Sequence, residues 1–322
     1  MASITLNAPA KVNLFLKILG RRRDGYNELY TIFERISLYD EVTITAVPRG
    51  ITVISNPPVT KRQTDNIAYK AAEAVIKEFG LRSGVKIRIK KRIPVAAGLG
   101  GGSSDAASVI LGMDRLFGLK MGRRRMFKIA SGIGADVPFF VLRTAFAIGT
   151  GSGERLKCLN IDKNIWHLLI YPGFGLSTKR VYRAFDGLDF ALIPRHSSGS
   201  STEYLSKYLT GRPGGVRIQP SFSGSTDLGT LEAMLYNDLQ CAAISEKKVL
   251  GSIIERLTSS LGKKVILSGS GPSVFCLCRT RKEAVDAGSK LRRAIPAGMR
   301  KRWKVFVVKT EYFKERVWRS RT

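Results

Sequence analysis

The chain has 322 residues, of which 44% are hydrophobic, enough to bury a sizeable core and to form two domains more readily than one. Its formal net charge is +29, from 54 lysines and arginines against 25 acidic residues. No run of about 18 apolar residues occurs, and the first residues lack the zones of a signal peptide. These features argue against a disordered or membrane-embedded chain and predict a globular, cytoplasmic protein.

The basic excess raises the question of a nucleic-acid partner. Basic runs at 123–125 and 300–302 are more often solvated faces than binding sites, and no RNA-binding or zinc-finger motif accompanies them. A nucleic-acid partner is therefore not expected, although a basic nucleic-acid-binding protein is the alternative from another functional class.

The cysteines support neither zinc nor a disulfide framework, because they form no CxxC pair and only two histidines are present. Cys276 and Cys278 alternate as residues on one face of a strand do, which predicts small core residues. The other two are Cys158 and Cys241.

The first half of the chain alternates strand and helix patterns, which indicates an α+β plan. Strands are expected at 4–19, 40–47 and 84–94, and a helix is expected at 66–80.

A further helix should follow residue 103, with Ser103 or Ser104 as its cap and Asp105 in its first turn. Its buried face is predicted from apolar residues at spacings of four, three and four: Ala106, Ile110, Met113 and Phe117.

The second half opens with a predicted strand at 165–173, and a Gly-, Ser- and Pro-rich segment at 186–230 predicts a mobile surface excursion. Two helices and three strands should follow, the helices at 231–244 and 249–262 and the strands at 263–271, 273–279 and 303–310.

The stretch PVAAGLGGGSSDAAS at 94–108 lies between a predicted strand and a predicted helix. Glycines let several backbone N–H groups converge there, and the helix dipole adds its positive end, so the stretch predicts a phosphate site. The Walker pattern fails because no lysine follows the glycines, and GxGxxG fails because Ser103 occupies the third glycine position after Gly98 and Gly100. A metal ion or basic residues from elsewhere must therefore neutralise the phosphates.

The same stretch resembles the phosphate loop of the GHMP small-molecule kinases, in the form with an extra Gly-Gly and an SSDAA ending. Three further segments resemble this family in the expected order: APAKVNLFLKILGRRRDGYNELYTIF, GIGADVPFF and LSGSGPSVF, so the likeness runs from residue 8 to residue 275.

The resemblance implies a two-domain α+β fold. Residues 1–155 would form a domain like ribosomal protein S5 domain 2, and residues 156–322 a ferredoxin-like domain that contains the segment 186–230.

The resemblance also implies a reaction, the transfer of the ATP γ-phosphate to the 2-hydroxyl of a cytidine diphosphate conjugate of methylerythritol, a step toward isoprenoid precursors, with magnesium as the second cofactor. Asp136 matches the family's catalytic base and Lys11 its cationic partner. Taken alone, Asp136 would be a turn or cap residue and Lys11 a lysine that reaches the surface.

Ten residues are candidates for binding ATP, with Ser104 also a candidate magnesium contact: Asn66, Lys91, Pro94, Gly98, Leu99, Gly100, Gly101, Gly102, Ser103 and Ser104.

Eight residues are candidates for binding the acceptor, with Tyr26 and Tyr182 stacking on cytosine: Asn13, Tyr26, Asn27, Tyr182, Ser268, Gly269, Ser270 and Gly271. Asn27 departs from the family motif, in which a histidine follows the tyrosine, and this bears on the identity of the acceptor but not on the kinase class. A kinase of the same type for homoserine or mevalonate is the alternative, and DGYNEL and the GGGSSDAA form argue against it.

Overall fold

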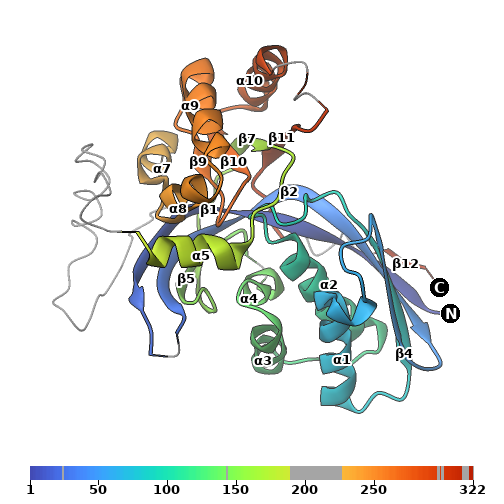
Figure 1. Cartoon of the computed structure of the whole chain (residues 1–322). Helices are drawn as coiled ribbons and strands as arrows, with labels where there is room; N and C mark the ends of the chain where they lie inside the picture. Colours follow the sequence, from blue (N-terminus) through green and yellow to red (C-terminus); the bar gives the residue numbers. More distant parts are fainter. Residues whose placement is uncertain are drawn as a thin grey trace. The chain divides into compact units, whose positions relative to one another are not determined.

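The computed structural model (Figure 1) describes residues 1–23, 25–142, 144–188, 227–295, 298, 301–313 and 319–321. The chain divides into two compact units, the first formed by residues 1–12, 18–158 and 310–322 and the second by residues 13–17 and 159–309. The first strand therefore contributes residues to both units.

The first unit is built on a mixed sheet in the order β12-β1-β2-β4-β3, with β5 paired to β2 and β6 paired to β5. Its strands are β1 (Ser3–Arg21), β2 (Asn27–Val47), β3 (Ile51–Asn56), β4 (Gly84–Lys90), β5 (Phe146–Gly151), β6 (Arg155–Leu159) and β12 (Arg319–Arg321). The strand expected at 40–47 is only the second half of β2, whose first half pairs with β5.

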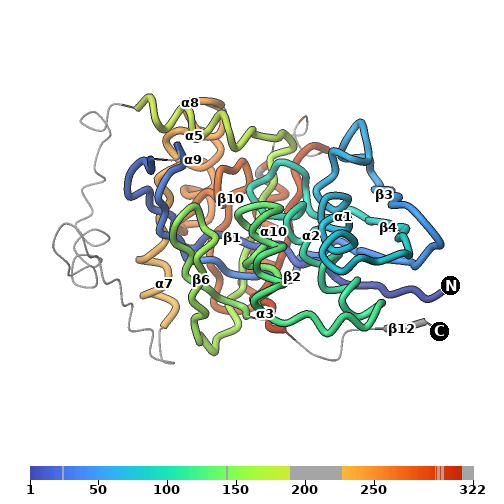
Figure 2. The backbone as a smooth tube through the Cα atoms, turned by 90° about the horizontal axis from the view of Figure 1, so that it is seen from below, coloured from blue at the N-terminus to red at the C-terminus, as the bar shows by residue number. Residues whose placement is uncertain are grey.

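Helices cover one face of this sheet (Figure 1). They are the 3₁₀ turn η1 (Gln63–Asp65) and the helices α1 (Ile67–Phe79), α2 (Gly101–Leu116), α3 (Arg123–Ile133) and α4 (Val137–Val141). Figure 2 shows α1 and α2 side by side, and they are in direct contact. The predicted apolar face of α2 is confirmed for Ala106, Ile110 and Met113, which are buried in the core. Phe117 is the C-cap that follows the helix and is only partly buried.

The start of α2 differs from the sequence prediction. The helix begins at Gly101, its N-cap is Gly100, and no side chain caps it. The predicted caps Ser103 and Ser104 therefore lie inside the helix, and Asp105 lies beyond its first turn. The physical reason is that Gly100 adopts a left-handed conformation, φ 68°, which starts the helix earlier than a serine cap would.

The second unit contains a four-stranded antiparallel sheet in the order β11-β7-β10-β9. Its strands are β7 (Trp166–Tyr171), β9 (Ile266–Leu267), β10 (Val274–Cys278) and β11 (Lys304–Lys309). With helices after the first and third of these strands, this order is that of the ferredoxin-like βαββαβ fold, as predicted. Cys276 and Cys278 are buried in β10, which confirms their predicted place in the core.

The helices of this unit are α5 (Thr178–Asp186), α7 (Leu228–Met234), α8 (Leu239–Glu246), α9 (Val249–Leu261) and α10 (Arg281–Ala294). The single helix expected at 231–244 is wrong, because the two-residue strand β8 (Tyr236–Asn237) interrupts it to pair with Phe15 and Leu16 of β1. Most of the predicted excursion at 186–230 lies outside the described residues.

Among the described residues, every helix is too short or too polar to cross a bilayer.

Gly112 provides a test of how closely α2 packs on the sheet. An added Cβ there would clash with Cδ1 of Ile44 and lie 3.0 Å from Cδ1 of Leu6. Gly112→Ala should therefore lower the free energy of unfolding by about 1–3 kcal/mol, although alanine is the better helix former. Denaturant unfolding measures this change. Gly132→Ala in α3 is the matched control, because its Cβ would meet no atom within 4 Å, and equal effects of the two substitutions would contradict the packing argument.

Candidate active site

The predicted phosphate stretch 94–108 is divided in the structure, because α2 begins at Gly101. The connection from β4 to α2, residues 91–100, is called the phosphate loop from here on, and its backbone adopts conformations that favour glycine. Gly98 and Gly100 have φ values of 75° and 68°, and Ala96 has a φ of 51°. A Cβ on Gly101 would lie 2.9 Å from Cγ2 of Ile93. Glycine is thus required for two reasons, a left-handed backbone at 98 and 100 and close packing at 101. The result is a segment with few side chains in front of a helix N-terminus, an arrangement suited to phosphate.

The loop lies against β1 at Lys11. The backbone N–H of Lys11 donates a hydrogen bond to the carbonyl of Leu99, with an N to O distance of 3.0 Å. A Cβ on Gly100 would lie 3.0 Å from both Cγ of Lys11 and the ring of Phe140. The structure therefore brings the predicted lysine directly beside the predicted phosphate loop.

Lys11 forms an ion pair with Asp136, with 3.7 Å between Nζ and Oδ2. The lysine side chain is 5% exposed and the aspartate side chain is 32% exposed, so the carboxylate is the member that solvent or a substrate can reach. Burial lowers the pKa of Lys11, and the nearby Asp136 opposes that shift. The two predicted catalytic residues, 125 positions apart in the chain, are thus brought together.

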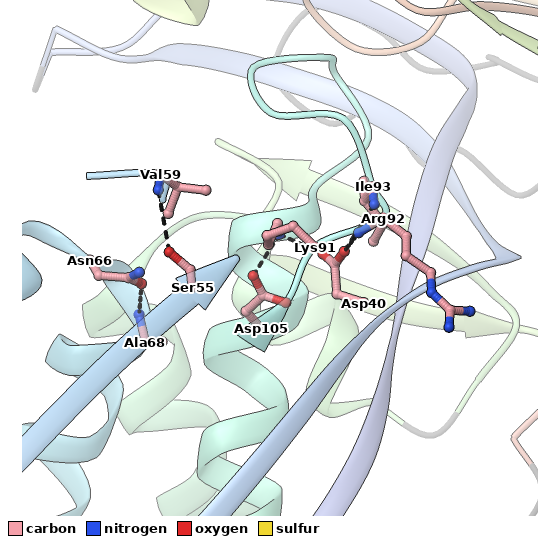
Figure 3. A network of polar contacts seen from close by, with 9 residues as sticks. All are labelled: Asp40, Ser55, Val59, Asn66, Ala68, Lys91, Arg92, Ile93 and Asp105. Carbon is pink, nitrogen blue, oxygen red and sulfur yellow. Dashed lines mark hydrogen bonds and ion pairs between the residues drawn. The ribbon is translucent and has the colours of Figure 1, made fainter. Parts of the chain in front are cut away.

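Lys91 lies at the other end of the loop, in a buried network (Figure 3). Its Nζ is 2.5 Å from Oδ2 of Asp40 and 2.7 Å from Oδ2 of Asp105. Burial alone would lower the pKa of Lys91, but the two carboxylates outweigh it and the pKa is raised. The other carboxylate oxygen of Asp40 accepts hydrogen bonds from the backbone N–H groups of Arg92 and Ile93, at 2.6 and 2.9 Å.

Asn66, a predicted nucleotide ligand, is the N-cap of α1, and its side chain accepts a hydrogen bond from the N–H of Ala68 at 2.9 Å. Figure 3 shows it in the same view as Lys91. Ser104, the predicted magnesium contact, is fully buried, and no hydrogen-bond partner for its hydroxyl is found among the described residues. It lines a small pocket that Arg35 and Tyr39 also line.

Tyr26 lies in the connection from β1 to β2, and Asn27 is the first residue of β2. Tyr26 is 66% exposed, so its ring is available for stacking. The turn is closed by a hydrogen bond from the N–H of Arg22 to the carbonyl of Tyr26 at 2.7 Å.

The turn at Ser268–Gly271 in the second unit is held by a residue that sequence reasoning missed. The side-chain amide of Asn237 donates hydrogen bonds to the carbonyls of Leu267 and Gly269, each at 2.8 Å. Gly271 is needed for close packing, because its Cβ would lie 2.5 Å from Cδ1 of Leu267. In the sequence, the tripeptide Tyr236-Asn237-Asp238 inside the predicted helix 231–244 was the signal that could have indicated a break at this position.

Tyr182 and Asn13 also belong to the second unit. Tyr182 lies in α5, whose first residue, Thr178, shares a hydrogen bond of 2.9 Å between its hydroxyl and that of Ser270. Asn13 is buried on β1, two residues after Lys11. The predicted acceptor residues therefore fall into two sets, Tyr26 and Asn27 in the first unit and the others in the second.

A glycine loop without a Walker lysine, beside a lysine and aspartate pair, defines a small-molecule kinase of the GHMP type when it occurs on this fold. Two family models match the chain, GHMP kinases N terminal domain over residues 66–144 and GHMP kinases C terminal over residues 222–297.

Individual relatives match over nearly their whole length. A 4-diphosphocytidyl-2-C-methyl-D-erythritol kinase of Geobacter metallireducens is 39% identical, over 90% of this chain and 95% of that protein. The protein of the same name from Acetivibrio thermocellus is 35% identical, over 96% of this chain and all of that protein. The chain therefore belongs to the GHMP kinases, in the family of 4-diphosphocytidyl-2-C-methyl-D-erythritol kinases.

Solved structures agree with this assignment. A crystal structure of 4-(cytidine 5'-diphospho)-2C-methyl-D-erythritol kinase matches with a TM-score of 0.71 and 31% identity, over 95% of this chain and 99% of that chain. Homoserine kinase from Cytophaga hutchinsonii matches with a TM-score of 0.70, over 99% of this chain and 97% of that chain, but at 18% identity it shows the shared fold alone. The comparisons do not favour the homoserine, mevalonate or nucleic-acid alternatives.

Asp105 generates a prediction about pH. Its burial, followed by the charge of Asp40, raises its pKa from 3.8 to about 7 despite Lys91. A raised pKa means that the folded protein holds a proton that the unfolded chain releases, so this contribution to stability is present below pH 3.8 and is lost as the pH rises toward about 7. Asp105→Asn removes the ionisation and keeps an oxygen that accepts from Lys91.

The difference in unfolding free energy between the Asp105→Asn variant and wild type should increase in favour of the variant as the pH rises from about 3.8 to about 7. The increase should be at least ~1.4 kcal/mol, the equivalent of one pKa unit. Denaturant unfolding of both proteins at several pH values measures the difference. If the unfolding free energies of the two proteins change in parallel with pH, the raised pKa assigned to Asp105 is contradicted.

Proposed function

We propose that this protein transfers the γ-phosphate of ATP to the 2-hydroxyl of 4-diphosphocytidyl-2-C-methyl-D-erythritol, in the non-mevalonate route to isoprenoid precursors. The observation that carries the proposal is the pairing of a buried lysine with an accessible aspartate directly beside the phosphate loop, in a chain that shares 39% identity with a relative of that name.

Asp136 acts as the general base in this proposal. Its carboxylate accepts the proton of the acceptor hydroxyl as the hydroxyl oxygen forms a bond to the γ-phosphorus, and the bond from that phosphorus to the β-γ bridging oxygen breaks to release ADP. Its 32% exposed side chain can reach an incoming hydroxyl.

Lys11 acts as the local cation. It keeps Asp136 ionised and stabilises the negative charge that develops on the transferred phosphoryl oxygens. Because burial already lowers its pKa, an approaching polyanion stabilises its charged form more than it would stabilise an exposed lysine. It thereby supplies the charge that a Walker lysine supplies in other phosphate loops.

The backbone from Gly98 to Ser103 binds the ATP phosphates in this proposal, supported by the left-handed glycines and the start of α2. Pro94, Leu99 and Asn66 lie at the loop or at the start of α1, where they shape the same nucleotide site.

Magnesium is proposed to arrive with ATP. Ser104 is not assigned as its ligand, because the hydroxyl is fully buried and lines a pocket in which Arg35 interacts with the charge of Glu311. Magnesium commonly keeps several waters and binds substrate phosphates, so no protein ligand is assigned to it.

Tyr26 is proposed to stack on the cytosine, with Asn27 presenting its main chain and amide to the base edge. Tyr182 and Asn13 are proposed as further acceptor contacts, and the turn at Ser268–Gly271 as a contact of the acceptor diphosphate. Two hydrogen bonds from Asn237 hold the backbone of that turn in place.

The direct test of the function is release of ADP by the purified protein with ATP, magnesium and 4-diphosphocytidyl-2-C-methyl-D-erythritol. Release should depend on this acceptor, whereas homoserine and mevalonate should give only the background rate. Acceptor-independent ADP release, or none at all, would contradict the proposed function.

Asp136→Asn should lower kcat by about 100- to 10,000-fold, the usual contribution of a general base. The KM for ATP should change little, because Asp136 is not a proposed nucleotide ligand. Steady-state kinetics measure both constants. Asp286→Asn, the same chemical change at an exposed position of α10, is the control and should retain wild-type kcat. A variant at position 136 with more than a tenth of wild-type kcat would rule out the assigned base.

Tyr26→Ala should raise the KM for the cytidine substrate by about 5- to 100-fold, the value of one stacking contact of roughly 1–3 kcal/mol. Tyr26→Phe keeps the ring and should retain the wild-type KM. The KM for ATP should stay unchanged in both variants. An unchanged acceptor KM in Tyr26→Ala would remove this tyrosine from the proposed site.

A further inference from the structure

The network of Asp40, Lys91 and Asp105 joins three segments that are distant in the chain. Asp40 belongs to β2, Lys91 begins the phosphate loop, and Asp105 belongs to α2. Figure 3 shows the three side chains converging, with the dashed contacts running from Lys91 to both carboxylates. The network therefore links the sheet to the loop entrance and to the helix that the loop leads into.

The segment 91–93 is held on several sides. Besides the two hydrogen bonds from Arg92 and Ile93 to Asp40, the N–H of Lys91 donates to the carbonyl of Asn56 at the end of β3, at 2.8 Å. The side chain of Ile93 packs so closely on Gly101 that no Cβ fits there. The three backbone N–H groups of the loop entrance and the side chains of Lys91 and Ile93 are thus engaged.

Lys91 itself is occupied by these contacts. Its side chain is 6% exposed, and the Asp40 side chain is fully buried. Carboxylate oxygens of Asp40 and Asp105 lie 2.5 and 2.7 Å from the ammonium, and a Cβ on Gly101 would lie 3.4 Å from it. These contacts fix the ammonium at the start of α2. A lysine held by two carboxylates is suited to fixing backbone geometry, whereas Lys11, with a single carboxylate partner, keeps charge that arriving phosphate can satisfy.

We propose that Asp40, Lys91 and Asp105 form a buried positioning network that fixes both ends of the phosphate loop for ATP, with Lys91 acting through the loop rather than as a nucleotide ligand. The proposal rests on the ATP-dependent function proposed above and deepens it. A loop that is fixed before ATP arrives needs no ordering when it binds, so its N–H groups contribute more affinity.

Asp40→Asn separates this role from direct contact. A fully buried acidic residue cannot itself ligate ATP, so any change in nucleotide affinity must pass through the loop. An asparagine cannot accept from both backbone N–H groups and Lys91 as the carboxylate does. We expect the dissociation constant of the non-hydrolysable analogue adenylyl imidodiphosphate, measured by calorimetry, to rise about tenfold or more. Because this measurement needs no acceptor, it is independent of whether the proposed acceptor is correct.

Glu34→Gln is the matched control, because Glu34 is a fully buried carboxylate on the same strand, hydrogen-bonded at 2.7 Å to Thr310. It should cost stability without weakening nucleotide binding. Lys91→Met should also raise the dissociation constant of the nucleotide. The double variant should have a dissociation constant no higher than that of the single variant with the larger effect, because each substitution already disrupts the same network.

Two results would overturn the proposal. If Lys91→Met weakens nucleotide binding while Asp40→Asn binds like wild type, Lys91 contacts the nucleotide directly. If Glu34→Gln weakens binding as much as Asp40→Asn, the effect is a general loss of stability. Should Asp40→Asn fail to fold, Asp105→Ala decides, because it removes the contact with Lys91 that Asp105→Asn keeps. A rise of about two- to fivefold in the dissociation constant would support the network, and an unchanged dissociation constant would refute it.

Discussion

Glycine at position 100 is the condition under which the phosphate loop can lie against Lys11. Any Cβ there would press on Lys11 and on the ring of Phe140, and the backbone is left-handed, so a side chain would push the loop away from β1. The hydrogen bond between Lys11 and Leu99 would then be lost. The glycine-rich part of the loop contains no lysine of its own, and Lys11 of β1 lies beside it instead. The same lysine forms an ion pair with Asp136.

The two buried lysines beside the loop show how surroundings divide the work between identical side chains. Lys91 lies between two carboxylates that raise its pKa, and its charge is thereby satisfied within the protein. At Lys11 burial outweighs Asp136 and lowers the pKa. A cation in that condition gains the most when phosphate charge arrives. The first arrangement suits a fixed support, and the second suits a group whose environment changes during the reaction.

Local patterns in the sequence predicted much of the fold, including the buried face of α2 and the strands of the second unit, because periodicity reports burial directly. Periodicity could not predict contacts between segments that are distant in the chain. Asp40 lies 51 residues before Lys91, and nothing in its own neighbourhood marks a partner. The interruption at Asn237 was missed because its pairing partner is on β1. Lys11 and Asp136 were found only through the family motifs, since each alone resembles an ordinary surface or turn residue.

The large positive charge of the chain does not determine the electrostatics of this site. Arg123, Arg124 and Arg125 are exposed on α3, and salt screens such charges over roughly 10 Å. In the buried network at the loop, Asp40 and Asp105 face a single ammonium, so the network adds no net positive charge to the site. In the proposed function, affinity for ATP comes from the loop backbone and Lys11, whereas the surface charge accelerates the encounter with anionic substrates. Binding strength and encounter rate would then be set by different residues.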